Sequence, residues 1–139
     1  MESPMRIRQV KLHDLEKIVR IEQANFLGEE ATSPEKLKEQ IEKIPNTFLI
    51  ADLNGEIAGY IIGSAVSSHH QSADRLVKGM RNLDKSNFIF LQRLSINPDF
   101  KGQGVGTLLL AAMKEVVVYL QNQGIYLACK DHLISYFVM

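Results

Sequence analysis

The chain has 139 residues but a single cysteine, no net charge and no long apolar run. With only Cys129 present, an intramolecular disulfide is excluded, a cysteine-based zinc site lacks its ligands, and we expect no metal. Sixteen basic side chains balance sixteen acidic ones without a dense run, so we expect no nucleic-acid partner. No window approaches the roughly 20 apolar residues of a membrane span, and no apolar signal stretch opens the chain. We therefore expect a cytoplasmic protein without a membrane partner.

The residues that are present are typical of one α/β domain, which we expect to span 1–139. Hydrophobic residues make up 45% of the sequence, enough for a single core at this length. Apolar periods of two and of about 3.6 predict the elements and their order. These are strand 5–10, helices 12–26 and 34–44, strands 47–53, 56–66 and 87–96, helix 104–123 and strand 125–129, with a long polar loop over 67–85.

Local signals mark the ends of several of these elements. Ser33 and Pro34 predict a helix start, since serine caps the first turn and proline tolerates its first position. Asn54-Gly55 between two apolar runs predicts a tight hairpin. Gly124 predicts the C-cap of the long helix, and Asp131 predicts the cap of a last helix.

The most informative segment joins strand 87–96 to helix 104–123. Three alternate glycines, Gly102, Gly104 and Gly106, follow Lys101 at the helix start. Free amides at a helix N-terminus attract anions, and glycines let a pyrophosphate approach the backbone. The alternative is a glycine-rich turn without a ligand, because short motifs often occur by chance.

This segment resembles the cofactor motif of the GNAT superfamily of N-acetyltransferases, Arg/Gln-x-x-Gly-x-Gly/Ala directly after the fourth strand. Here it stands as Lys101-Gly102-Gln103-Gly104-Val105-Gly106, with lysine where arginine or glutamine is usual. The resemblance implies a mixed α/β sheet, mostly antiparallel, with splayed fourth and fifth strands and helices on both faces. The order of the predicted elements agrees with it from Met5 onward.

Shorter phrases resemble the arylalkylamine (serotonin) N-acetyltransferase-like branch of that superfamily. They lie at Asp14-Leu15, Ile21-Glu22, Phe26, Glu30–Ser33 and Cys129–Ile134. This resemblance implies transfer of an acetyl group from acetyl-CoA, as co-substrate, to the primary amine of a small molecule. The residues that it places around the cofactor are Leu94, Ser95, Ile96, Lys101, Gly102, Gln103, Gly104, Val105, Gly106 and Thr107.

The side chains that carry the chemistry in this branch are replaced here. Two histidines that relay the amine proton correspond to Phe90 and Gln92, and the tyrosine general acid corresponds to Phe137. Tyr136 is adjacent, and we take it as the candidate catalytic acid because a phenol can protonate a thiolate. These replacements keep a second hypothesis open, a non-catalytic CoA-binding or interaction module.

The superfamily usually continues through a last helix into two further strands, so we expect a C-terminally truncated version of the fold. The edge beside strand 125–129 would then be unpaired, and we expect homodimerisation through it. A dinucleotide-binding domain is a weaker alternative. Its Gly-x-Gly-x-x-Gly pattern fails at Thr107, although Asp131 lies at a suitable spacing to meet a ribose.

Other polar residues have two interpretations. Glu30 and His69 are candidate acceptor-binding residues, Glu30 beside the first helices and His69 in the long loop. For Glu22 and Arg93 we favour ordinary surface positions, and for Cys129 a buried thiol rather than a nucleophile.

Overall fold

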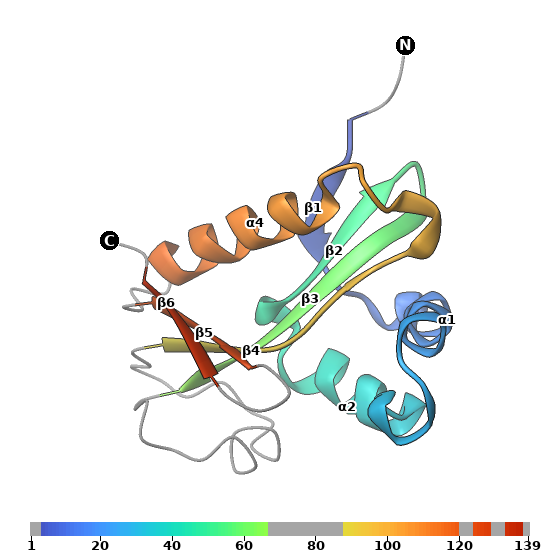
Figure 1. The fold of residues 1–139 in the computed structure, drawn as a ribbon, viewed down its shortest axis with the longest axis horizontal. Coiled ribbons are helices and arrows are strands. Elements are labelled where there is room, and N and C mark those ends of the chain that lie inside the picture. The colour runs from blue at the N-terminus through green and yellow to red at the C-terminus, as the bar shows by residue number, and fades with distance from the viewer. Residues whose placement is uncertain (1–3, 67–87, 120–123, 129–132, 138–139) are drawn as a thin grey trace.

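The computed structural model describes residues 4–66, 88–119, 124–128 and 133–137. Its strands form one six-stranded sheet in the order β1-β2-β3-β4-β5-β6. Figure 1 shows α4 lying across one face of this sheet, with α1 and α2 on the other. The elements are β1 (Arg6–Gln9), η1 (Leu12–Asp14), α1 (Leu15–Asn25), η2 (Gly28–Glu30), α2 (Pro34–Lys43), η3 (Pro45–Thr47), β2 (Phe48–Leu53), β3 (Glu56–Val66), β4 (Phe88–Ile96), η4 (Pro98–Phe100), α4 (Val105–Tyr119), β5 (Gly124–Ala128) and β6 (Leu133–Phe137).

The sheet is antiparallel except at one pair of strands, β4 and β5. Phe88–Leu91 of β4 run parallel to residues 124–127 of β5. The rest of β4, residues 92–96, is paired only with β3 in the described part of the chain. The mixed, mostly antiparallel α/β sheet is therefore confirmed, whereas the splaying of β4 from β5 stays a prediction.

The predicted local signals at the first helices and the hairpin are confirmed. The Ser33 hydroxyl accepts a hydrogen bond from the Lys36 amide at 3.1 Å, and Pro34 is the first residue of α2. Asn54 and Gly55 have φ values of 54° and 89°, as a tight turn between β2 and β3 requires. The strands that they join pair antiparallel from Phe48 opposite Ile62 to Leu53 opposite Glu56.

Each face of the sheet has its own hydrophobic core. Helix α4 packs on one face through Val105, Leu109, Met113 and Val117, all buried. Helices α1 and α2 pack on the other face. Their buried apolar side chains are Ile18, Ile21, Leu37 and Ile41, which meet Phe48, Ile50, Tyr60 and Ile62 of the sheet.

A β-bulge interrupts β4 in the middle of the sheet. Ile62 of β3 is opposite Arg93, but the next residue, Gly63, is opposite Leu91, so Gln92 is an extra residue. Leu91 and Leu94 both pack in the core under α4. The bulge thus turns both Gln92 and Arg93 toward the α1 and α2 side, where regular alternation would have sent only one.

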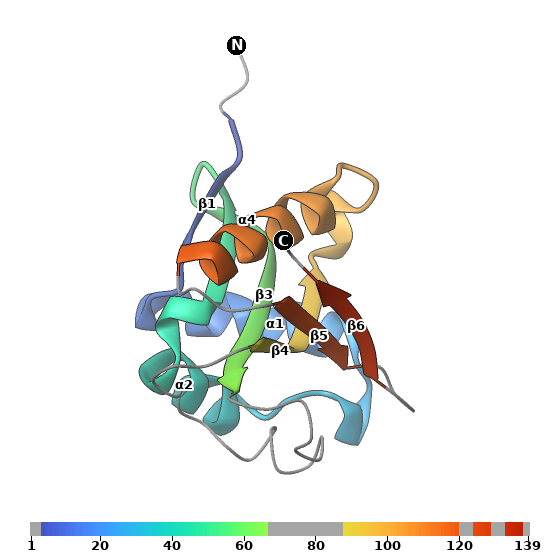
Figure 2. The same ribbon diagram turned by 90° about the vertical axis from the view of Figure 1, so that its left-hand side faces the viewer.

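The predictions for the C-terminal third are wrong in two respects. Gly124 is the first residue of β5 and not a helix cap, because it pairs with Phe88 and Phe137. Residues 133–137 form strand β6 and not a helix, and Figure 2 shows β6 beside β5. Strand β6 covers the edge of β5 that we expected to be unpaired. This pairing removes the argument for homodimerisation through the β5 edge, and homodimerisation itself stays a prediction.

Candidate active site

The predicted cofactor-binding loop, residues 101–104, which we call the cradle, lies between two buried residues at the start of α4. Strand β4 leads into the turn η4, where Phe100 is 9% exposed, and α4 begins at Val105, which is 2% exposed. The residues between these two, 101–104, are all exposed. Phe100 and Val105 pack in the same core cluster, so they hold a solvent-facing loop over the edge of the sheet.

The three glycines of the motif, two in this loop and one in α4, differ in backbone conformation and surroundings. Gly102 and Gly104 have φ values of 81° and 77°, which side-chain-bearing residues rarely adopt, and a Cβ on either would project into open space. Gly106 lies inside the helix, and a Cβ there would stay 3.8 Å from the nearest atom. The first bond of α4 runs from the Leu108 amide to the Gly104 carbonyl at 3.1 Å. Within the described chain, the amides of 102–107 have no backbone acceptor.

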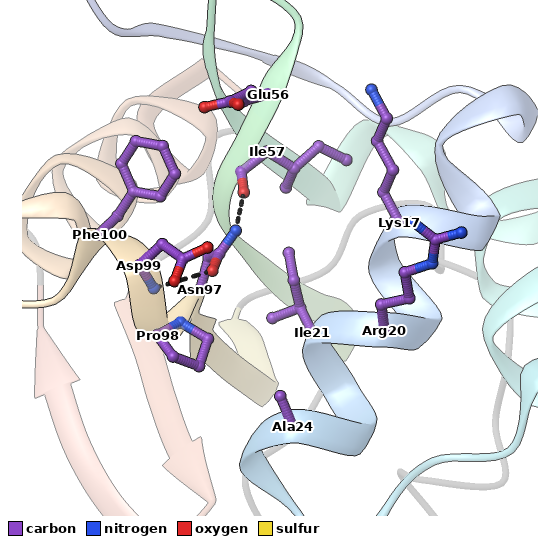
Figure 3. Close-up of a pocket in the computed structure, with 10 residues that line it drawn as sticks. All are labelled: Lys17, Arg20, Ile21, Ala24, Glu56, Ile57, Asn97, Pro98, Asp99 and Phe100. Carbon is purple, nitrogen blue, oxygen red and sulfur yellow. Dashed lines mark hydrogen bonds between the residues drawn. The ribbon is translucent and has the colours of Figure 1, made fainter.

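Asn97 fixes the direction in which β4 enters this turn. Its side chain donates to the Ile57 carbonyl and accepts from the Asp99 amide, each at 3.0 Å (Figure 3). A cavity of about 580 Å³ lies between this turn and α1. Figure 3 shows Lys17 and Arg20 on its helix wall. Both cations already have partners, since Lys17 donates to the Gly55 carbonyl and Arg20 to Glu16. Glu56 and Asp99 also line this cavity, so its charge is mixed.

The predicted cofactor-binding stretch of β4 is anchored to α1. Asn25 donates to the Ser95 hydroxyl and to the Ile96 carbonyl, both at 2.7 Å. Leu94 and Ile96 pack on the opposite face, in the core under α4. Side chains on both faces hold this stretch in place, and its backbone lies two residues upstream of the turn into the cradle.

A buried polar network connects α1 to β3 and β4, and it corrects our interpretation of Glu22 as a surface charge. Glu22 has no exposed surface. Its carboxylate accepts from the Tyr60 hydroxyl and from the Thr32 amide, the latter at 2.7 Å. Burial, together with the bond to Glu22, raises the pKa of Tyr60 well above its usual range, so this phenol stays protonated.

Arg93 is the cationic member of this network, and its predicted place on an exposed strand face is also wrong. One guanidinium nitrogen lies 2.8 Å from the Glu22 carboxylate and donates to the Glu30 carbonyl at 2.7 Å. The guanidinium carbon lies 3.7 Å from the centre of the Phe26 ring, a cation–π contact. Glu30 thus contributes its backbone carbonyl here, and its expected role toward an acceptor stays a prediction.

A smaller cavity of about 380 Å³ opens at the bulge of β4. Its walls are formed by Thr32, Ser33, Lys36, Gln40, Ile62, Gln92 and Arg93. Gln40 donates to the Gln92 side-chain oxygen at 2.7 Å, and Gln92 donates in turn to the Ser64 hydroxyl. Among the described residues, Oε1 of Gln40 and Nε of Arg93 are buried without a hydrogen-bond partner.

The predicted catalytic residues are only partly placed. Phe90 is fully buried and Gln92 is engaged in the amide chain, so neither position supplies a base. Tyr136 belongs to β6, so the helix that was to present it is absent, and its catalytic role stays a prediction. His69, Cys129 and Asp131 lie outside the described residues. No group of three metal-ligating side chains occurs in the part of the chain that is described.

The sequence analysis missed Gln40, Tyr60 and Asn25 as members of the site. Each lies on a regular helix or strand, and its role depends on contacts with residues distant in sequence. A weak signal existed for Gln40. It occupies the buried side of α2, where Leu37 and Ile41 set an otherwise apolar pattern.

The strand order agrees with the fold that the sequence motif predicted, and a family model decides the family. A model of the GNAT acetyltransferase family matches residues 15–135. The chain belongs to the GNAT acetyltransferase family. An acetyltransferase from Pectobacterium atrosepticum is 24% identical over 115 residues, which cover 82% of this GNAT chain and 68% of that relative. No described helix is long and apolar enough to cross a membrane.

Solved structures share this GNAT fold at low identity. The loading GNATL domain of CurA from Lyngbya majuscula has a TM-score of 0.78 at 19% identity, over 90% of this chain and 64% of its own. The PaiA N-acetyltransferase from Thermoplasma acidophilum, in complex with coenzyme A, has a TM-score of 0.66 at 18% identity, over 93% and 82%. The chain thus spans less than two thirds of the CurA domain. The antiparallel sheet also excludes a doubly wound dinucleotide fold.

Proposed function

We propose that this chain binds acetyl-CoA and transfers its acetyl group to the primary amine of a small molecule. The observation that carries the proposal is the exposed loop 101–104, in which the amides of 102–104 lack backbone acceptors in the described chain and precede the first turn of α4. Such amides, with the positive end of the helix dipole behind them, form an anion site suited to a pyrophosphate. Lys101 adds a cation beside them, and Gln103 and Thr107 lie exposed at the same rim.

The reaction needs alignment of an amine with the thioester more than it needs unusual side chains. The amine nitrogen bonds to the thioester carbon, the carbon–sulfur bond breaks, and the proton leaving nitrogen ends on the CoA sulfur. The products are an amide and free CoA. Backbone amides of residues 94–96 would hold the thioester oxygen, and such preorganised donors are a large part of catalysis in acyl transfer.

The arylalkylamine branch remains a proposal within this function. The phrases that resemble it support it, and Phe90 and Gln92 weaken it because neither can relay a proton. Tyr136 is the proposed acid, and water is the proposed carrier of the amine proton.

The second candidate function is a CoA-binding module without catalysis. It is favoured by one observation, the burial of Phe90 where a base would be needed. Release of free thiol from acetyl-CoA in the presence of amines separates the two functions, because a binding module releases none.

Calorimetric titration with acetyl-CoA tests the cradle, with NADH as the control ligand. The Gly104→Ala variant places a methyl group in the open space of the loop and strains its positive φ, so we expect binding to fall at least tenfold. Gly55→Ala is the matched control, since Gly55 also has a positive φ with open space around it but lies in the β2–β3 turn. Equal affinities in the two variants would contradict the cradle.

A further inference from the structure

Besides the cradle, the cavity at the β4 bulge is a second candidate binding site in the described part of the molecule. A buried polar atom without a hydrogen-bond partner is energetically unfavourable, and two such atoms, Gln40 Oε1 and Arg93 Nε, belong to residues that line this one cavity. Gln40 is 4% exposed, so bulk water does not satisfy it. Turning both glutamine amides over would exchange the atoms but still leave one polar end of Gln40 unpaired.

The larger cavity beside the cradle offers no such atoms, because its cations are bonded to Gly55 and Glu16. The apolar groove between β1 and the end of α4 has an exposed Tyr119, but nothing in the structure shows what covers it. The bulge cavity is therefore the stronger candidate. Its volume of about 380 Å³ is at the small end for a ligand site, which suits a compact molecule.

The cavity is also polarised along α2. Ser33, Lys36 and Gln40 line it from the first turn of the helix inward, so its outer part carries the positive helix end and an ammonium group. Arg93 adds a donor, although Glu22 balances its charge. These positive groups favour a ligand oxygen that accepts hydrogen bonds, above all that of a carboxylate. They disfavour a ligand ammonium group in this outer part of the cavity.

Resting on the proposed function, we infer that this cavity recognises an acceptor whose amine adjoins a carboxylate or carbonyl group, that is, an α-amino acid or its amide. The oxygen accepts from the Arg93 guanidinium, and a donor on the ligand reaches the side-chain amide of Gln40. The two residues of the bulge lie within three positions of Leu94–Ser95, at about 3.3 Å per residue. A ligand in the cavity thus lies close to the backbone stretch proposed to hold the thioester. The chemical step is unchanged, with the amide forming as CoA takes the proton.

Matched pairs of acceptors test this inference. L-alanine, L-phenylalanine and L-lysine are compared with ethylamine, phenethylamine and cadaverine by thiol release, with the amino acid amides as a third arm. We expect kcat/KM to be about tenfold or more higher for the amino acids or amides, the range for one hydrogen bond to a charged group. Bare amines that are used equally well or better would overturn the inference.

Variants separate this inference from the proposed function. Gln40→Met should reduce the preference to about one while leaving acetyl-CoA affinity unchanged, since Gln40 does not touch the cradle. Gln23→Met, at an exposed position of α1, is the control and should keep the preference. If acetyl-CoA binds but no acceptor reacts, binding of N-acetyl-L-phenylalanine against N-acetylphenethylamine, measured by NMR titration with CoA present, gives the answer. Equal binding of the two in the wild-type chain would also overturn the inference.

Discussion

The Glu22 carboxylate on α1 and the Arg93 guanidinium on β4 form an ion pair of 2.8 Å, in which the carboxylate has no exposed surface. Tyr60 and Thr32 supply further hydrogen bonds to Glu22, so the buried charge is satisfied on several sides. The pair joins the helix layer to the strand that leads into the cradle. Its loss would therefore affect both the stability of the domain and the position of that strand.

We expect Glu22→Gln to lower the free energy of unfolding by about 3 kcal/mol, because removing one partner leaves the other charge without compensation. Glu16→Gln on the same helix is the matched control. Glu16 pairs with Arg20 at 2.7 Å, but both side chains are more than 70% exposed, so we expect a loss below about 0.5 kcal/mol. Urea denaturation of the two variants measures the difference, and similar losses would contradict the network.

The hydrogen bonds of the Asp14 carboxylate should make the stability of the domain decrease in acid. Burial would raise the pKa of Asp14, but the bidentate bond from Arg8 and the bond from the Lys11 amide outweigh it and hold the pKa below its usual range. The contribution of this carboxylate is therefore complete above about pH 4, its unfolded pKa, and is lost as pH falls through the folded pKa.

The Asp14→Asn variant should be less stable than the wild type at neutral pH, and the two stability curves should converge in acid. Urea midpoints measured from about pH 6 down to about pH 2 follow this convergence. Asp99→Asn, at an exposed position, is the control and should run parallel to the wild type. A constant gap between Asp14→Asn and the wild type would show that this carboxylate does not carry the dependence.

Gly59 lies where β3 passes under the start of α4, and the close packing there leaves little room for a side chain. An added Cβ would lie 2.8 Å from the Ser95 carbonyl oxygen and 3.1 Å from a Val105 methyl group. We expect Gly59→Ala to cost about 1–3 kcal/mol in unfolding free energy. Gly106→Ala has room at 3.8 Å and lies in a helix, so we expect it to be neutral or to stabilise by up to about 1 kcal/mol. Thermal denaturation of both variants checks the opposite signs.

If the Tyr136 phenol protonates the leaving thiolate, removing its hydroxyl should slow acetyl transfer. We expect Tyr136→Phe to lower kcat by about 100-fold or more, within the range for general acid catalysis, with little change in acetyl-CoA affinity. Thiol release and calorimetry on the same preparation provide the two values. An unchanged kcat would assign the proton to water.

The features that the sequence predicted well are those set by neighbouring residues. Ser33 caps its helix, and Asn54-Gly55 turns the hairpin. Each of these depends on a few adjacent residues, so the sequence pattern contains the information.

The features that it predicted wrongly depend on contacts across the fold. Asp131 looked like a helix cap, but residues 133–137 pair with β5 over five positions, and this pairing outweighs a local capping preference. Glu22 looked like a surface charge because its partners, Tyr60 and Arg93, are far away in sequence. The cavity at the β4 bulge was missed for the same reason, since α2 and β4 each contribute only part of it.

The extra residue in β4 acts as a phase shift between the two halves of the strand. If the bulge were flattened with Gln92 kept in regular alternation, Leu94 and Ser95 would exchange faces relative to residues 88–91. Deleting Gln92 would instead restore regular pairing and leave every other residue of β4 on its present face. The extra residue thus places a second polar side chain beside α1 and α2 while the apolar residues of β4 keep their contacts with α4.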